Sequence, residues 1–127
     1  MKTIFLAESE IHVLEALRLL FGCQPDYELV GQARSAASLL ARAAKLAPDA
    51  ILLDWNLPDL RPQRAIPALR RACPAAKIVA LSVKPEHAKI ADEFGLDGFI
   101  SKQLAPDAFL ELFESIMRHS ENVKENP

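Results

Sequence analysis

Residues 50–59 read AILLDWNLPD, an apolar run that meets an aspartate and then breaks at Asn-Leu-Pro-Asp. An apolar run without polar alternation predicts a strand covered on both faces, as in a parallel sheet with helices on each side. Because such a strand ends where burial ends, we expect Asp54 at its carboxyl edge. In open α/β sheets, that edge is where ligands bind.

Four more short apolar runs predict strands, and helical patterns separate them. The strand-like runs cover residues 3–7, 27–33, 77–81 and 98–101, and the helical patterns cover 11–21, 35–46, 67–73, 85–94 and a segment that begins at Pro106. Ser35 is a candidate helix cap, Pro67 fits the first turn of its helix, and Gly95 is a helix stop. Five strands alternating with five helices through right-handed crossovers predict a doubly wound α/β domain with a parallel sheet.

Composition bounds the class of protein. The chain has 127 residues with a net charge of −2, which predicts one globular domain and gives no case for binding nucleic acid or an anionic membrane. No apolar run approaches the ~18 residues of a membrane span, so we expect a cytoplasmic protein. Two cysteines are too few for a disulfide framework, and the three histidines lack ligand spacing, so we assign them no role. Residues 120–127 are polar and predict a tail or the start of a linker after a domain of residues 1–119.

A polar residue ends or follows each of four predicted strands: Glu8, Asp54, Ser82 and Lys102. If these strands are neighbours, the four side chains meet in one crevice. Two carboxylates close together need a cation, and Mg²⁺ is the natural one. A carboxylate beside a metal and a lysine is suited to forming an aspartyl phosphate. The alternative is that loops are polar everywhere; we favour function because four such residues converge.

The stretches LLDWNLPD, IVALS and GLDGFISK resemble the receiver domain of bacterial two-component response regulators, and the resemblance covers residues 2–119. Asp54-Trp55-Asn56 with Pro58 is similar to the chemotaxis-type receiver. The run VLEALRLLF, and a Gln after Lys102, look more like receivers joined to helix-turn-helix outputs. The resemblance implies a flavodoxin-like (βα)5 fold with strand order 2-1-3-4-5.

The resemblance also implies roles for individual residues. Asp54 would be the phospho-acceptor, Ser82 the switch hydroxyl, Lys102 the phosphoryl-binding lysine and Phe99 the aromatic switch residue. A sensor histidine kinase or phosphotransfer protein would phosphorylate Asp54. Phosphorylation would then shift the face formed by the fourth helix, fifth strand and fifth helix, which a downstream output domain or protein reads. Homodimerisation on that face is consistent with this function, and the chain would not be an enzyme with a diffusible substrate.

The metal site departs from the family pattern at Ser9. The resemblance implies Mg²⁺ ligands from Glu8, Asp54 and the main-chain carbonyl of Asn56, but Ser9 stands where the family usually has a second acid. Serine is a poor ligand for a hard dication, so we expect weak Mg²⁺ binding. The interpretation that we favour for Ser9 is that it caps the first helix, with Glu10 favouring the helix dipole.

Three functions remain open at this point. The leading hypothesis is a phospho-accepting receiver. Its rival is an atypical receiver with a weakened metal site (Glu8-Ser9) that acts as a phosphorylation-independent protein-interaction module. A flavodoxin-like binder of a small ligand ranks third because no glycine-rich phosphate loop follows the first strand.

Overall fold

Five strands and five helices alternate along the part of the chain that the structure, a computed structural model, describes: residues 1–125, with side chains to residue 119. The elements are β1 (Lys2–Ala7), α1 (Ile11–Gly22), β2 (Tyr27–Ala33), α2 (Ala36–Leu46), β3 (Ala50–Asp54), α3 (Pro62–Ala72), β4 (Lys77–Ser82), α4 (His87–Glu93), β5 (Gly98–Ser101) and α5 (Pro106–Glu125).

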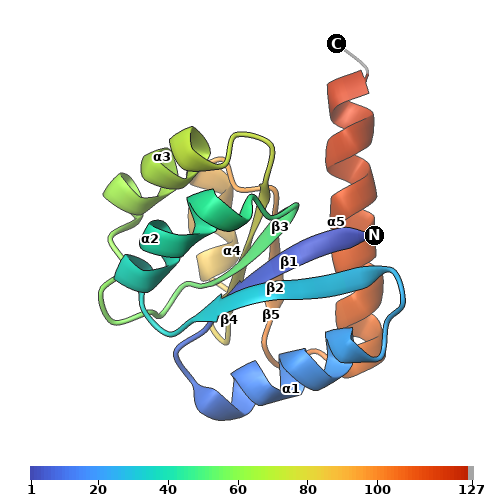
Figure 1. Ribbon diagram of the computed structural model, residues 1–127. Coiled ribbons are helices and arrows are strands. Elements are labelled where there is room, and N and C mark those ends of the chain that lie inside the picture. Colours follow the sequence, from blue (N-terminus) through green and yellow to red (C-terminus); the bar gives the residue numbers. More distant parts are fainter. Residues whose placement is uncertain (126–127) are drawn as a thin grey trace.

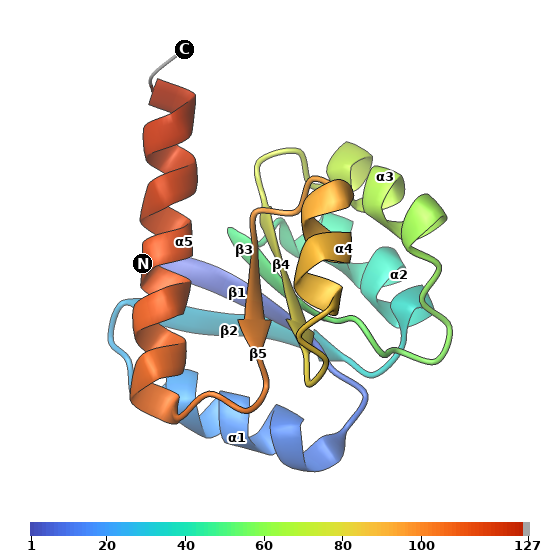
Figure 2. The ribbon, with the colours of Figure 1, turned by 180° about the vertical axis from the view of Figure 1, so that it is seen from behind.

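The strands form one parallel sheet in the order β2-β1-β3-β4-β5. Helices α1 and α5 cover one face, and α2, α3 and α4 cover the other, as Figures 1 and 2 show from opposite sides. The predicted doubly wound fold and strand order are therefore confirmed. Every residue of β3 and of β4 is buried, which explains why these two strands lack polar alternation.

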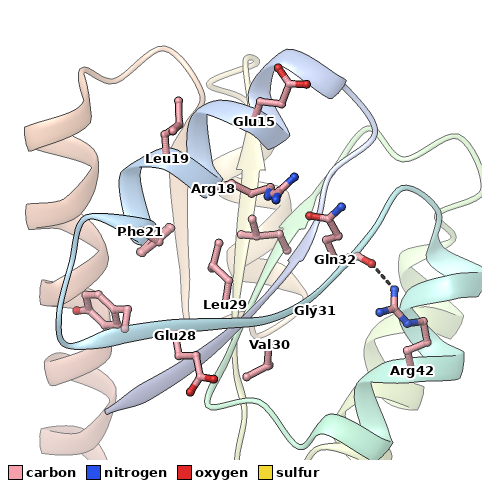
Figure 3. A pocket seen from close by; sticks show the side chains of 13 residues that line it. Glu15, Arg18, Leu19, Phe21, Glu28, Leu29, Val30, Gly31, Gln32 and Arg42 are labelled. Atoms are coloured by element: carbon pink, nitrogen blue, oxygen red, sulfur yellow. Dashed lines mark hydrogen bonds between the residues drawn. The ribbon is translucent and has the colours of Figure 1, made fainter.

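Strand β2 is an edge strand, and a hollow of about 880 Å³ runs beside it between α1 and α2. Its lining carries charges of both signs, from Glu15 and Arg18 of α1, Glu28 of β2 and Arg42 of α2 (Figure 3). The Arg42 guanidinium donates a hydrogen bond to the Gln32 carbonyl, which occupies one acceptor of this strand. The hollow shares no residue with the predicted phosphorylation site.

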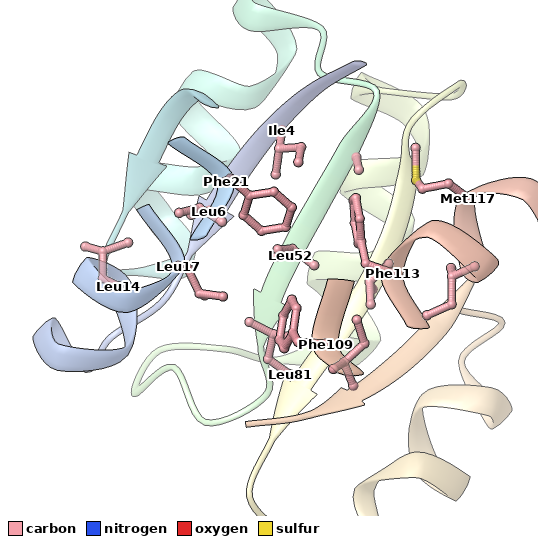
Figure 4. Close-up of a cluster of buried hydrophobic side chains, with 14 residues drawn as sticks. Ile4, Leu6, Leu14, Leu17, Phe21, Leu52, Leu81, Phe109, Phe113 and Met117 are labelled. Atoms are coloured by element: carbon pink, nitrogen blue, oxygen red, sulfur yellow. The ribbon is translucent and has the colours of Figure 1, made fainter. Parts of the chain in front are cut away.

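Two buried clusters hold the helices on the sheet. Between the sheet and α1 and α5, the rings of Phe21 and Phe113 meet edge-to-face with centroids 5.3 Å apart (Figure 4). The cluster on the other face packs Phe5, Leu53 and their neighbours against α2 and α3. Each fully buried side chain of this size contributes roughly 1.5–3 kcal/mol, so the clusters fix the sheet that carries the site.

Three helices differ in part from the prediction. Helix α3 begins at Pro62, whose missing N–H is harmless at a first helical position, so Pro67 lies inside the helix and not in its first turn. The apolar positions of the 11–21 pattern, with Ile11 as the first, predict one buried face for α1, but Ile11 is 41% exposed. Helix α5 continues to Glu125, so the segment predicted as a tail is helical over 120–125, and residues 126 and 127 lie outside the described residues. The domain boundary at residue 119 stays a prediction.

Two predicted helix ends are confirmed. The Ser35 side chain accepts a hydrogen bond from the Ser38 N–H at 3.1 Å and so caps α2. Gly95 follows α4 with a φ of +73°, a conformation that glycine adopts without strain.

Candidate functional site

The sheet register brings the predicted polar residues to one edge. Ala7 of β1 pairs with Leu53 of β3, so the residues that follow, Glu8 and Asp54, emerge side by side. Ser82 ends β4, and its carbonyl accepts a hydrogen bond from the Lys102 N–H at 2.9 Å. Asp54 of β3 also pairs with Leu81 of β4, so the carboxyl ends of β1, β3, β4 and β5 lie along one edge.

The Asp54 carboxylate is fully buried and accepts four hydrogen bonds. Its Oδ1 accepts from Lys102 Nζ and from the Asn56 N–H, each at 2.9 Å. Its Oδ2 accepts from the Ser9 hydroxyl at 2.7 Å and from the Ser9 N–H at 3.1 Å. Burial raises the pKa of Asp54, but these donors outweigh burial and hold the pKa below its ordinary value. Asp54 is therefore a carboxylate at neutral pH.

Lys102 bridges the two buried acids. Its Nζ lies 2.9 Å from Asp54 Oδ1 and 2.9 Å from Glu8 Oε2. Burial lowers the pKa of Lys102, but the two carboxylates outweigh burial and raise it, so the ammonium stays charged. One cation thus faces two acids inside the protein.

The pKa of Glu8 is raised in this site. Burial raises its pKa to about 7, and the charge of Asp54 adds to the rise, although hydrogen bonds from Lys102 and Glu10 lower it. Glu8 is fully buried, and its Oε1 is the one such side-chain N or O atom without a hydrogen-bond partner among the side chains described here. That oxygen is therefore available to a proton or to a cation.

We expect the raised pKa of Glu8 to weaken the fold as pH rises. Between pH 5 and pH 7 the folded protein retains a proton that the unfolded chain has released, so the free energy of unfolding decreases by about 2 kcal/mol across this window. The window follows from the ordinary glutamate pKa of 4.5 and the folded pKa of about 7. The change is measured by urea unfolding in metal-free buffer, with Glu8→Gln as the comparison. A wild-type slope equal to that of Glu8→Gln would contradict the assignment.

Ser9 does not cap α1, contrary to the expectation. Glu10 occupies the cap position, without a side-chain cap bond. The Ser9 hydroxyl donates to Asp54 instead, because a hydrogen bond to a buried carboxylate is stronger than the bond that a capping hydroxyl accepts from a backbone N–H. The guanidinium of Arg34, a residue that sequence reasoning missed, donates to the Ser9 carbonyl at 2.8 Å and 3.2 Å and fixes this turn.

Ser82 has a neighbour that was assigned no role. Its Oγ lies 2.7 Å from Nδ1 of His87 and accepts a hydrogen bond from the Lys84 N–H at 3.0 Å. The sequence holds no signal for the His87 contact, since a histidine five residues after a serine matches no ligand spacing.

The remaining predicted residues lie around this centre. Asn56 is exposed and contacts Asp54 through its N–H. Phe99 is half-buried on β5 and lines a hollow of about 230 Å³ together with Ala88 and Ala91 of α4. The Trp55 ring packs against the Phe94 ring, with centroids 5.8 Å apart.

The family follows from comparison with known proteins. A family model described as "Response regulator receiver domain" matches residues 4–114. The chain belongs to this receiver family. Receiver domains of response regulators are signalling proteins and not classical enzymes.

The receiver is similar to two nitrate/nitrite response regulators. The nitrate/nitrite response regulator protein NarL of Escherichia coli K12 is 30% identical over 111 residues, which are 86% of this chain and 51% of NarL. NarP of the same strain is 32% identical over 97 residues, which are 75% of this chain and 45% of NarP. The receiver thus spans about half the length of the curated relatives that it matches.

Solved structures agree on the fold. A LuxR-family two-component response regulator from Aurantimonas sp. SI85-9A1 superposes with a TM-score of 0.83 at 24% identity, covering 94% of this chain and 86% of that one. The receiver domain of the response regulator NarL from Mycobacterium tuberculosis superposes with a TM-score of 0.81 at 18% identity, covering 92% and 96%. Within residues 1–125, no helix of the receiver is long and apolar enough to cross a bilayer.

Receiver domains generally bind Mg²⁺ at the phosphorylation site. In this chain, the described side chains contain no group of three His, Cys, Asp or Glu residues arranged to hold a metal. What the site offers is the carboxylate pair of Glu8 and Asp54, including the unpartnered Glu8 Oε1. These hard oxygen donors suit Mg²⁺, which keeps waters in its remaining positions.

Proposed function

We propose that this receiver accepts a phosphoryl group on Asp54 from a sensor histidine kinase or phosphotransfer protein and signals by a change of surface. The observation that carries the proposal is the Lys102 ammonium, which lies 2.9 Å from a buried, ionised Asp54. A fixed cation beside a carboxylate nucleophile is the arrangement that stabilises charge on an incoming phosphoryl group.

The chemistry is a transfer between two nucleophiles. An Asp54 oxygen attacks phosphorus, an O–P bond forms, and the N–P bond of the phosphohistidine donor breaks, leaving the imidazole on the partner. Each of the two Asp54 oxygens already accepts two hydrogen bonds. One donor therefore has to move away before that oxygen can attack phosphorus. The Ser9 hydroxyl is the donor that rotates most freely, whereas main-chain N–H groups are fixed.

Mg²⁺ would be held by Glu8, Asp54 and the Asn56 main-chain carbonyl, and it would neutralise phosphoryl oxygens. Ser9 supplies no charge to that set, so the affinity for Mg²⁺ is expected to be low. Lys102 supplies the permanent positive charge, and its contact with Glu8 keeps it in place when Asp54 is modified.

Phosphorylation would change the surface formed by α4, β5 and α5, and a partner would recognise that change. Ser82 at the end of β4 would donate to the phosphoryl group, and Phe99 on β5 would change its packing against α4. Two relatives of about twice the length, YdfI of Bacillus subtilis and DegU of Brevibacillus brevis, are named transcriptional regulatory proteins, which supports an output domain or protein as the reader. We place the receiver in the cytoplasm, and a homodimer on this surface is consistent with the function.

Intact mass after incubation with acetyl phosphate and Mg²⁺ tests the proposal, with Asp54→Asn as the matched control. We expect one phosphoryl adduct on the wild-type protein and none on Asp54→Asn, since an amide oxygen is not a nucleophile here. An adduct on both proteins would place the acceptor elsewhere. No adduct on either would favour a phosphorylation-independent interaction module, which we do not favour now because Asp54 and Lys102 keep the contact that the chemistry needs.

A further inference from the structure

The Ser82 hydroxyl is held by two neighbours and is nearly buried. Ser82 lies at the end of β4 and is 3% exposed. The Lys84 N–H donates to Ser82 Oγ at 3.0 Å, and Nδ1 of His87 lies 2.7 Å from the same oxygen. The second contact is short enough to be a full hydrogen bond, and its direction depends on where the imidazole carries its hydrogen.

The tautomer of His87 decides whether the Ser82 O–H can donate to another acceptor. A serine hydroxyl has one hydrogen to donate and two lone pairs to accept with. Lys84 occupies one lone pair. If Nδ1 of His87 carries no hydrogen, the Ser82 O–H must donate to it, and no hydrogen remains for another acceptor. If Nδ1 carries a hydrogen, it donates to the second lone pair, and the O–H is free.

We propose that His87 is a positioning residue for the Ser82 hydroxyl: in the unmodified protein Nδ1 accepts the Ser82 O–H, and a hydrogen on Nδ1 releases that O–H to a phosphoryl group on Asp54. This inference rests on the proposed function, because it needs a phosphoryl acceptor beside Ser82. His87 is half-buried, and a change of tautomer moves the hydrogen from Nε2 to Nδ1 without changing the charge of the ring.

The contact also links the hydroxyl to a surface helix. His87 is the first residue of α4, which starts shortly after the end of β4 (Figure 2). When Ser82 turns toward Asp54 it either keeps the hydrogen bond and moves the start of α4, or it gives up the bond. Either route alters the contact that His87 makes at the start of α4, so His87 connects the proposed phosphorylation site to the proposed output surface.

The first test is a double-mutant cycle on the initial rate of adduct formation, measured by intact mass with acetyl phosphate and Mg²⁺. His87→Ala releases the hydroxyl, so we expect the rate to rise about three- to tenfold, the effect of one hydrogen bond. In the Ser82→Ala background the same change has no hydroxyl to release, and we expect less than about a twofold effect. His119→Ala, an exposed histidine on α5, is the matched control and should leave the rate unchanged.

The second test uses the wild-type protein, so no variant has to fold. Nitrogen-15 NMR of the histidine rings distinguishes a protonated Nδ1 from a bare one. We expect a bare Nδ1 at His87 without phosphodonor and a protonated Nδ1 with acetyl phosphate and Mg²⁺. A protonated Nδ1 in both states, or an equal effect of His87→Ala with and without Ser82, would overturn the inference while leaving the phospho-acceptor intact. A wild-type protein that forms no adduct would overturn the proposed function and this inference together.

Discussion

Lys102→Met is expected to lower the free energy of unfolding at pH 8 by about 3–5 kcal/mol, because it leaves buried charge uncompensated. Lys102 Nζ contacts both Glu8 and Asp54, and both acids are fully buried. Methionine keeps most of the side-chain volume, so the loss reports charge and not packing. Unfolding in urea, followed by circular dichroism, measures the change.

The pH dependence of this loss in the free energy of unfolding identifies its cause. Without the lysine, the carboxylate pair binds a proton more strongly, so the folded variant gains stability as pH falls from 8 to 5. The loss at pH 5 should therefore be clearly smaller than the loss at pH 8. Lys89→Met removes an exposed lysine of α4 and should change stability little at either pH. A loss of the same size at both pH values would show that Lys102 acts through packing alone.

Ser9→Asp is expected to tighten Mg²⁺ binding on the order of tenfold, because it adds a charged oxygen ligand to a two-carboxylate site. In metal-free buffer the same change places a third acid near one lysine and should lower the free energy of unfolding by about 1–3 kcal/mol. Added Mg²⁺ should then stabilise the variant more than the wild-type protein. Trp55, the single tryptophan of the chain, follows Asp54 and provides the fluorescence signal for the titration.

Ser9→Asn separates charge from size in this experiment. Asparagine has nearly the same shape as aspartate and no charge, so it should bind Mg²⁺ no better than the wild-type protein. If Ser9→Asp also leaves the titration unchanged, position 9 is not a ligand position. If Ser9→Asn tightens binding as much as Ser9→Asp does, the gain comes from removing the Ser9–Asp54 hydrogen bond and not from added charge.

The amino-acid sequence alone predicted five parallel strands, four of which lead into polar residues, and the family resemblance supplied the strand order that brings Asp54 to Glu8 and Lys102. Apolar runs and helical periodicity are local patterns, and a parallel sheet brings the ends of its strands together whatever the details of packing. The lysine at the end of β5 could therefore be placed beside an acid 48 residues earlier in the chain.

Only the tertiary structure decided which hydrogen bonds the site makes. Ser9 precedes a helix, and a local reading favours a cap, but Asp54 lies 45 residues away in sequence and next to it in space. The contact of His87 with Ser82 and the raised pKa of Glu8 likewise depend on burial and on the direction of side chains. Sequence patterns together with the family resemblance identify which strand ends meet. Desolvation and the competition of nearby donors for one acceptor are set only when the chain is folded.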